Sequence, residues 1–250
     1  MLSAKPWRLD WVAFLISAIL LGLFVGMSLA LLLEQVLPLK QSANRLFIQF
    51  VVSSVSFQGV ALVLFQVFLK KHGVGWKELL GLNVPGLRRA IGLGLVVGLL
   101  VIPAVLLLNN ASALLMKLLH LTPEEQPTLK VLQVSAGVWQ RVGFGLAAIL
   151  VAPLVEEVLF RGILYPAIKQ LGRPRLAFWG TSILFAAIHA NLMTFIPLTV
   201  FAMVLIVLYE RTDSLMAPIT AHCLFNAVNF CLFLLEPQLT RWLDFTHGRV

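Results

Sequence analysis

The stretch LVAPLVEEVLFRGIL (150–164) carries two adjacent glutamates and an arginine inside an otherwise apolar sequence. The nearest charged residues on either side of it are Arg141 and Lys169, which lie 28 positions apart (169 − 141). A helix of that length extends about 42 Å at 1.5 Å per residue, so the two acids fall near the middle of a segment that can cross a bilayer. We therefore expect a membrane-spanning helix whose charged groups are held inside the protein.

The whole chain has the composition of a membrane protein. Hydrophobic residues make up 60% of its 250 residues and charged residues 12%, whereas an ordinary soluble domain has roughly 45–50% and about 25%. Long uncharged runs recur between short polar gaps, each near the ~20 residues that a helix needs to cross a bilayer. We expect an all-α fold, a polytopic transmembrane helix bundle of about seven to eight helices. The expected spans are 11–33, 46–70, 90–116, 138–168, 175–190, 193–209 and 214–235. The fourth of these is long enough to contain a break.

All 250 residues are expected to form a single membrane domain. The first apolar run follows two basic residues, as in a signal peptide, but it is too long for an h-region and lacks a small-residue cleavage site, so we expect a retained helix. The polar gap at 117–137 predicts a turn or a short interfacial helix, in which Glu124 and Glu125 are solvated. Cys223 and Cys231 lie on one expected helix and indicate no disulfide framework.

The net charge of +8 is expected to orient the protein in the membrane rather than to bind nucleic acid. With the N-terminus inside, eleven Lys and Arg residues fall in inside segments and seven in outside segments. Basic residues favour the cytoplasmic side, so the N-terminus is expected to be cytoplasmic. The inside set is Lys5, Arg8, Lys70, Lys71, Lys77, Arg88, Arg89, Lys169, Arg173, Arg175 and Arg211. The outside set is Lys40, Arg45, Lys117, Lys130, Arg141, Arg241 and Arg249.

The two glutamates of the opening stretch are expected to have different partners. Glu157 and Arg161 lie four positions apart, so they share one helix face and can form an ion pair. Glu156 is rotated by about 100° from Glu157, so its carboxyl group is expected to face another neighbour. A lone carboxylate at the bilayer centre costs on the order of 2.5–3.5 kcal/mol. Because Arg161 cannot readily neutralise both acids, Glu156 is the stronger candidate for a functional group.

Three more polar residues occur in later apolar runs. His189 ends SILFAAIH, and His222 and Asn226, in ITAHCLFNAV, lie four positions apart on one helix face. Small residues accompany all three and permit close packing of helices. We therefore expect Glu156, His189, His222 and Asn226 to converge on one cluster.

Such a cluster could hydrolyse an amide bond without a covalent intermediate. A glutamate beside an imidazole can deprotonate a water, and a second imidazole with an amide group can donate hydrogen bonds to an oxyanion. Glu156, His189 and His222 could instead hold a catalytic zinc ion, although the chain has no HExxH motif. Two other classes stay open: a non-catalytic immunity or scaffold protein, and a proton-coupled transporter, for which corresponding pairs of broken helices are missing.

At these residues the sequence resembles the CAAX protease and bacteriocin-processing family (CPBP, or Abi), whose founding members are type II CAAX prenyl endopeptidases. The family motifs EExxxR, FxxxH and HxxxN occur here in this order, each in an apolar run. The resemblance covers about 140–235, the expected catalytic core, while 1–139 match only as additional N-terminal membrane helices. The matching residues are Glu156, Glu157, Arg161, Phe185, His189, His222 and Asn226.

The resemblance implies an intramembrane endopeptidase, of the glutamate type or the metallo type. It assigns the activation of water to Glu156 and His189, and the oxyanion site to His222 and Asn226. The supporting residues would be Glu157, Arg161 and Phe185. We prefer a reaction without a metal, with zinc on Glu156, His189 and His222 as the alternative.

The resemblance also bounds the substrate. Members that are similar to the eukaryotic enzymes remove the last three residues from a prenylated Cys-a-a-X segment, whereas many bacterial members are linked to peptide processing or bacteriocin immunity. This compact chain looks like a bacterial member, so we expect it in the bacterial plasma (inner) membrane. Its expected partners are the lipid bilayer and a membrane-embedded or lipid-anchored peptide or protein, with no nucleic acid.

Overall fold

The computed structural model describes residues 5–36, 42–123 and 137–246, and within these ranges the chain folds into helices and turns with no strand. The elements are α1 (Leu9–Val36), α2 (Ser42–Ser54), η1 (Val55–Gly59), α3 (Val60–Lys71), α4 (Trp76–Leu79), α5 (Leu87–Leu118), α7 (Val138–Leu146), η2 (Ala147–Val151), α8 (Ala152–Glu157), η3 (Val158–Leu164), α9 (Tyr165–Gln170), α10 (Pro174–Ala187), α11 (Leu192–Thr212) and α12 (Met216–Thr246). The π-helical segment η1 joins α2 to α3, and η2 and η3 join α7, α8 and α9, so the described chain forms eight continuous helices. The expected turn or interfacial helix at 117–137 lies mostly outside the described residues.

Six of these helices, within the described residues, are long and apolar enough to cross a membrane. They confirm an integral membrane protein with a polytopic helix bundle. They are Leu9–Leu33, Phe47–Lys71, Leu87–Leu118, Val138–Gln170, Leu192–Thr212 and Met216–Leu235. The helix at 138–170 is continuous, and at its centre it has π-helical turns instead of a break.

The expected span at 175–190 is shorter than predicted. α10 has 14 residues, about 21 Å of helix, whereas the hydrocarbon core of a bilayer is about 30 Å thick. It begins at Pro174, which suits the first turn of a helix, and it stops before His189. The histidine therefore lies in the turn that follows α10 and not within a spanning helix.

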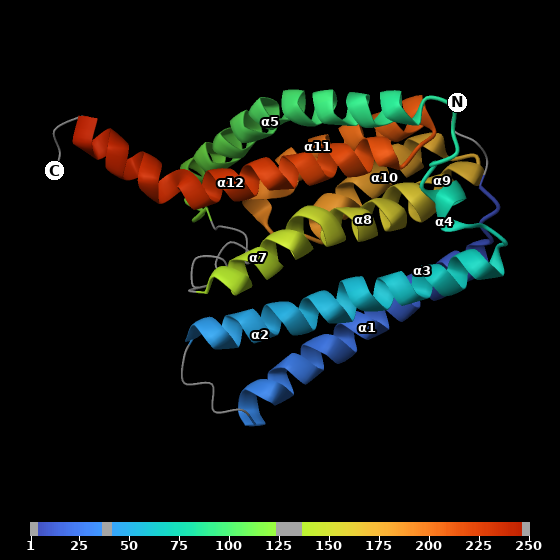
Figure 1. The fold of residues 1–250 in the computed structure, drawn as a ribbon, viewed down its shortest axis with the longest axis horizontal. Coiled ribbons are helices and arrows are strands. Elements are labelled where there is room, and N and C mark those ends of the chain that lie inside the picture. Colours follow the sequence, from blue (N-terminus) through green and yellow to red (C-terminus); the bar gives the residue numbers. More distant parts are fainter. Residues whose placement is uncertain (1–4, 37–41, 124–136, 247–250) are drawn as a thin grey trace.

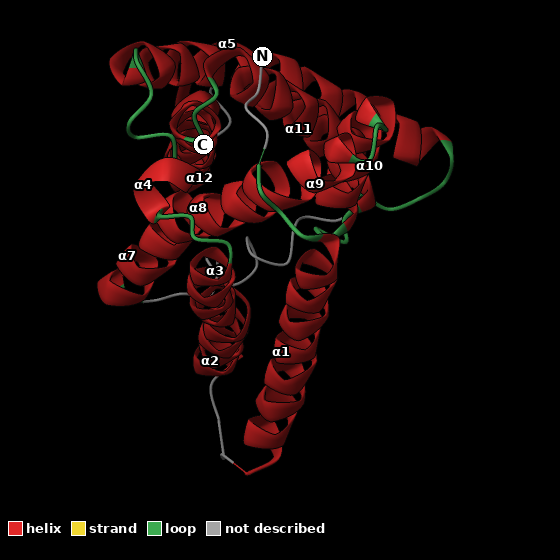
Figure 2. Cartoon of the chain, turned by 90° about the vertical axis from the view of Figure 1, so that its right-hand side faces the viewer, coloured by secondary structure: helices red, strands yellow, loops and turns green. Residues whose placement is uncertain are grey.

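The helices form two groups (Figures 1 and 2). The long helix α7–α9 packs beside α10, α11, α12 and α5 in one bundle, in which α5 contacts both α11 and α12. α1 and the helix α2–α3 form a hairpin that projects from this bundle. All the candidate site residues belong to the bundle.

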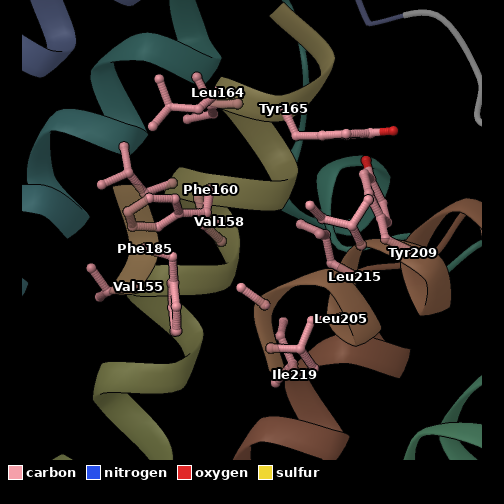
Figure 3. Close-up of a cluster of buried hydrophobic side chains, with 14 of the residues drawn as sticks. Val155, Val158, Phe160, Leu164, Tyr165, Phe185, Leu205, Tyr209, Leu215 and Ile219 are labelled. Carbon is pink, nitrogen blue, oxygen red and sulfur yellow. The ribbon is translucent and has the colours of Figure 1, made fainter. Parts of the chain in front are cut away.

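Buried apolar side chains from several helices form a cluster beside the central helix (Figure 3). Val155, Val158 and Phe160 of the α7–α9 helix are buried, as are Phe185 of α10 and Leu205 of α11. A core residue of this kind contributes about 1.5–3 kcal/mol when it is buried, although within a bilayer packing replaces part of that term. The central helix is thus enclosed on several sides.

Two glycines allow α5 to pack directly on α12, the helix that carries His222. A Cβ atom at Gly94 would lie 2.1 Å from the Thr220 hydroxyl oxygen and 2.4 Å from the Ala217 carbonyl oxygen. A Cβ atom at Gly98 would lie 3.0 Å from the Cα atom of Ala221. Small residues at such positions let helix backbones approach closely in membranes.

Replacing Gly94 by alanine is therefore expected to lower the free energy of unfolding by about 1–3 kcal/mol, the usual range for overpacking. One of the two obstructing atoms is the Ala217 carbonyl oxygen, which belongs to the backbone, so α5 and α12 must separate. Gly92 is the matched control, because no heavy atom lies within 4 Å of its Cβ position. Gly92→Ala should stabilise the helix by about 0.5–1 kcal/mol. Thermal unfolding of both variants in detergent measures the difference, and equal midpoints would contradict the prediction.

Candidate active site

The ion pair predicted within the central helix is present and buried. Arg161 Nη1 donates to Glu157 Oε1 at 2.9 Å, and the two side chains are 2% and 0% exposed. Arg161 Nη2 donates to the carbonyl oxygen of Ala202 in α11 at 3.0 Å. The guanidinium carbon also lies 4.6 Å from the centre of the Phe185 ring. Arg161 thus connects the central helix to both α10 and α11.

Glu157 has a second partner that the spacing did not predict. Its Oε1 atom accepts a hydrogen bond from His222 Nδ1 at 2.8 Å. Because a carboxylate paired with Arg161 is an acceptor, we assign the imidazole proton to Nδ1. The lone pair of neutral His222 is then on Nε2, so this imidazole is oriented by Glu157 and can accept a proton.

Glu156 faces the other side of the same imidazole. Its Oε2 atom lies 3.9 Å from His222 Nε2, and its side chain is 13% exposed. This distance is too long for a direct hydrogen bond, but a water can bridge it. The two glutamates were expected to face different neighbours, but both face His222: Glu157 binds Arg161 and Nδ1 of His222, while Glu156 faces Nε2.

Asn226 lies one turn after His222 and caps a carbonyl group of the central helix. In η2, the amide of Ala152 bonds to the carbonyl oxygen of Ala147, five residues back. The next π-helical donor, for Ala148, would be residue 153, but Pro153 has no N–H. Asn226 Nδ2 donates to the Ala148 carbonyl oxygen at 2.8 Å and satisfies it. One N–H of the expected oxyanion donor is therefore used within the protein, and the second remains for another partner.

The Phe185 ring lies between His189 and His222 and contacts both. Its Nδ1 atom bonds to the Phe185 carbonyl oxygen at 2.7 Å, so that nitrogen carries the proton. The Phe185 ring packs on the imidazole of His189, with ring centres 5.0 Å apart, and on that of His222 at 5.8 Å. The turn that carries His189 leads into α11, where Asn191 accepts a hydrogen bond from the Thr194 amide as an N-cap.

The residues considered for zinc are not placed as a ligand set. Among the side chains that the structure describes, no group of three or more His, Cys, Asp or Glu residues could hold a metal ion. Of the three expected ligands, His222 uses Nδ1 to bond Glu157, and His189 uses Nδ1 to bond the Phe185 carbonyl oxygen. The arrangement does not fit a three-residue zinc site as it stands, and the expectation of a reaction without a metal stays a prediction.

The candidate site lies within a part of the chain that matches the model of a known protein family. Residues 137–228 match the family model described as "Type II CAAX prenyl endopeptidase Rce1-like". Two proteins of Bacillus subtilis (strain 168) are similar to part of the chain. "Uncharacterized protein YpbD" is 33% identical over 91 residues, 35% of this chain and 44% of that protein. "Putative membrane peptidase YdiL" is 31% identical over 88 residues, 35% of this chain and 36% of that protein. The chain thus spans less than half the length of either relative, and no solved structure matches it.

Proposed function

We propose that this protein, whose residues 137–228 belong to the type II CAAX prenyl endopeptidase Rce1-like family, is a membrane endopeptidase. It hydrolyses a peptide bond in a membrane-embedded or lipid-anchored peptide or protein. The observation that carries this proposal is the position of Glu156 Oε2, 3.9 Å from an imidazole nitrogen of His222. The opposite nitrogen of that imidazole is held by the buried Glu157.

In this proposal a water lies between Glu156 and an imidazole. Glu156 takes one proton from the water, the hydroxide oxygen attacks the peptide carbonyl carbon, and the protonated Glu156 then gives its proton to the departing amine. The second hydrogen of the water is held by an imidazole. Family resemblance favours His189 for that role, whereas the distance to Glu156 and the orientation by Glu157 favour His222 Nε2.

The negative charge on the carbonyl oxygen requires hydrogen-bond donors. The second N–H of Asn226 is one candidate, because its first N–H is bound to Ala148 and fixes the amide plane. The imidazole that does not hold the water is the other candidate when it is protonated. A donor fixed before the reaction stabilises charge more effectively than one that must reorganise.

The orientation proposed from the sequence places the N-terminus in the cytoplasm. The substrate then reaches the active site from the cytoplasmic side of a bacterial plasma membrane. α1 begins, α3 ends, α5 begins and α9 ends at one end of the bundle (Figure 1). The eleven basic residues of the inside set belong to segments at this end. Their excess over the opposite side supports a cytoplasmic location.

Reconstitution of the full chain into lipid vesicles tests the function. A set of membrane-anchored peptides is incubated with the protein in ¹⁸O-labelled water, and the products are identified by mass spectrometry. The expected product is a new C-terminal carboxylate that carries one ¹⁸O atom, formed without an acyl-enzyme. The expected activity persists in a strong chelator, and elemental analysis of the same sample finds no stoichiometric zinc. Cleavage that stops when stoichiometric zinc is removed would overturn the metal-free mechanism, and intact peptides throughout would overturn the proposed function.

A further inference from the structure

The residues just before α1, 5–8, form a short N-terminal strap over the end of the bundle where α9 ends (Figure 1). The carbonyl oxygen of Lys5 accepts a hydrogen bond from the Gln170 side chain at 2.6 Å. The backbone amide of Arg8 donates to His72 Nε2 at 3.1 Å, at the end of α3. The strap is therefore bound both to the central helix and to the α1–α3 hairpin.

Trp7 is the buried residue of this strap. Its side chain is 5% exposed, and its ring packs on Phe68 and His72 with ring centres 5.1 and 5.3 Å apart. Its indole N–H donates to the carbonyl oxygen of Gly162 at 2.8 Å, across 155 residues of sequence. Gly162 is one residue after Arg161, in the π-helical segment η3.

The carbonyl group of Gly162 needs a donor from outside its own helix. In an α-helix its partner would be the amide of residue 166, four positions on, but Pro166 has no N–H. The indole of Trp7 supplies the missing hydrogen. Asn226 likewise donates a hydrogen bond to the Ala148 carbonyl oxygen near Pro153. Each π-helical segment of the central helix therefore has one carbonyl group that accepts a hydrogen bond from a side chain distant in sequence.

The register of η3 determines where Arg161 points relative to the rest of the site. The amide of Tyr165 bonds to the Phe160 carbonyl oxygen, five residues back, as in a π-helix. If such a turn relaxed to an α-helical turn, one residue fewer would fit and the two sides of the helix would rotate against each other by about 100°. The pair of Glu157 and Arg161 spans the start of η3. A donor that fixes the position of η3 therefore also holds this pair in place.

We propose that Trp7 is a positioning residue for the active site, because its indole N–H satisfies the Gly162 carbonyl, which has no α-helical donor at Pro166, and so fixes the position of η3 beside Arg161. This inference rests on the proposed function for its catalytic readout. It assigns to the N-terminal strap a part in catalysis from a distance, through the central helix. Trp7 itself touches neither the candidate water nor the candidate oxyanion site.

Kinetics of the full chain in vesicles provide the first test. Trp7→Phe keeps an aromatic ring on Phe68 and His72 but removes the N–H, and it is expected to lower kcat about tenfold with KM little changed, since small misplacements of catalytic groups are costly. Trp11→Phe is the matched control, because the Trp11 ring lies edge-on to Phe14 and beneath the Lys71 amine, both in the α1–α3 hairpin, and its kcat is expected to stay within about twofold of wild type.

Pro166→Ala supplies the decisive comparison. It introduces a backbone N–H at the position that can bond to the Gly162 carbonyl, so the indole donor is no longer needed. In the Pro166→Ala background, Trp7→Phe is therefore expected to change kcat by less than about twofold. A tenfold effect of Trp7→Phe in both backgrounds would overturn the proposal, because loss of ring packing would explain it. No effect in either background would overturn it as well.

Hydrogen exchange separates this inference from the proposed function. In detergent, Trp7→Phe is expected to raise amide exchange in peptides that cover 158–170, and Trp11→Phe is not. If exchange at 158–170 rises in Trp7→Phe but the wild type cleaves no peptide, the role of Trp7 in positioning η3 is supported and the peptidase function is not. Unchanged exchange at 158–170, together with normal wild-type proteolysis, would overturn the role of Trp7 alone.

Discussion

Glu157→Leu is expected to lower the free energy of unfolding by about 3–5 kcal/mol, the cost of leaving one member of a buried ion pair without its partner. Arg161 has 2% exposure, and after this change it keeps the Ala202 carbonyl and the rings of Phe185 and Phe160, none of which carries a negative charge. His222 also loses the acceptor of its Nδ1 proton. Unfolding in a denaturing detergent, followed by circular dichroism, measures the loss.

The double variant Glu157→Leu with Arg161→Met distinguishes a pair effect from a packing effect. Removing both charges leaves no uncompensated ion, so the double variant should be more stable than either single variant. Each single variant should cost several kcal/mol, and the double variant about 2 kcal/mol or less. If the loss of unfolding free energy in the double variant equals the sum of the losses in the two single variants, the prediction is contradicted. The double variant should still be inactive, because His222 is no longer oriented.

Glu156→Gln is expected to have the opposite effects: kcat should fall by about 10²-fold or more, the scale of general acid–base catalysis. The free energy of unfolding should change by no more than about 0.5 kcal/mol. In the described structure Glu156 faces the neutral imidazole of His222, whose Nε2 atom lies 3.9 Å from Oε2, so removal of the Glu156 charge leaves no buried ion unpaired. Initial rates of cleavage in vesicles and thermal unfolding of the same preparation give the two values. Normal cleavage by Glu156→Gln would remove Glu156 from the mechanism.

The two histidines can be separated in the same assay. If His222 holds the water, His222→Gln should lose activity as fully as Glu156→Gln, and His189→Gln should retain a measurable fraction. If the reverse pattern is observed, the water partner is His189, as the family resemblance implies. Both variants should remain folded, since neither leaves Arg161 without Glu157.

The class of the protein and the central ion pair could be predicted from the sequence because both depend on short-range patterns. Hydrophobic length indicates a membrane helix, and a spacing of four places Glu157 and Arg161 on one face. The family model matches residues 137–228, a range that contains all the motif residues. These features need no knowledge of how the helices turn toward one another.

The partners of His222 could not be obtained in the same way. Which face of α8 meets α12 depends on two π-helical segments, and each inserts an extra residue into a turn that a regular 3.6-residue pattern does not include. The resemblance implied that His222 belongs to the oxyanion site, and the bond between its Nδ1 atom and Glu157 is a contact that the spacing did not predict. Pro153 and Pro166, both inside one expected span, were the signal that the regular pattern would be interrupted.

The shortness of α10 has a consequence for the supply of water. A helix of about 21 Å that starts at the membrane boundary ends inside a hydrocarbon core of about 30 Å, and the turn at 188–191 follows it. Peptide groups of such a turn cannot face lipid, so they must be enclosed by protein or reached by solvent. His189 lies in this turn and is partly exposed. A hydrolase consumes one water in every cycle, and under the proposed function the early end of α10 is a place where solvent can reach the His189 imidazole.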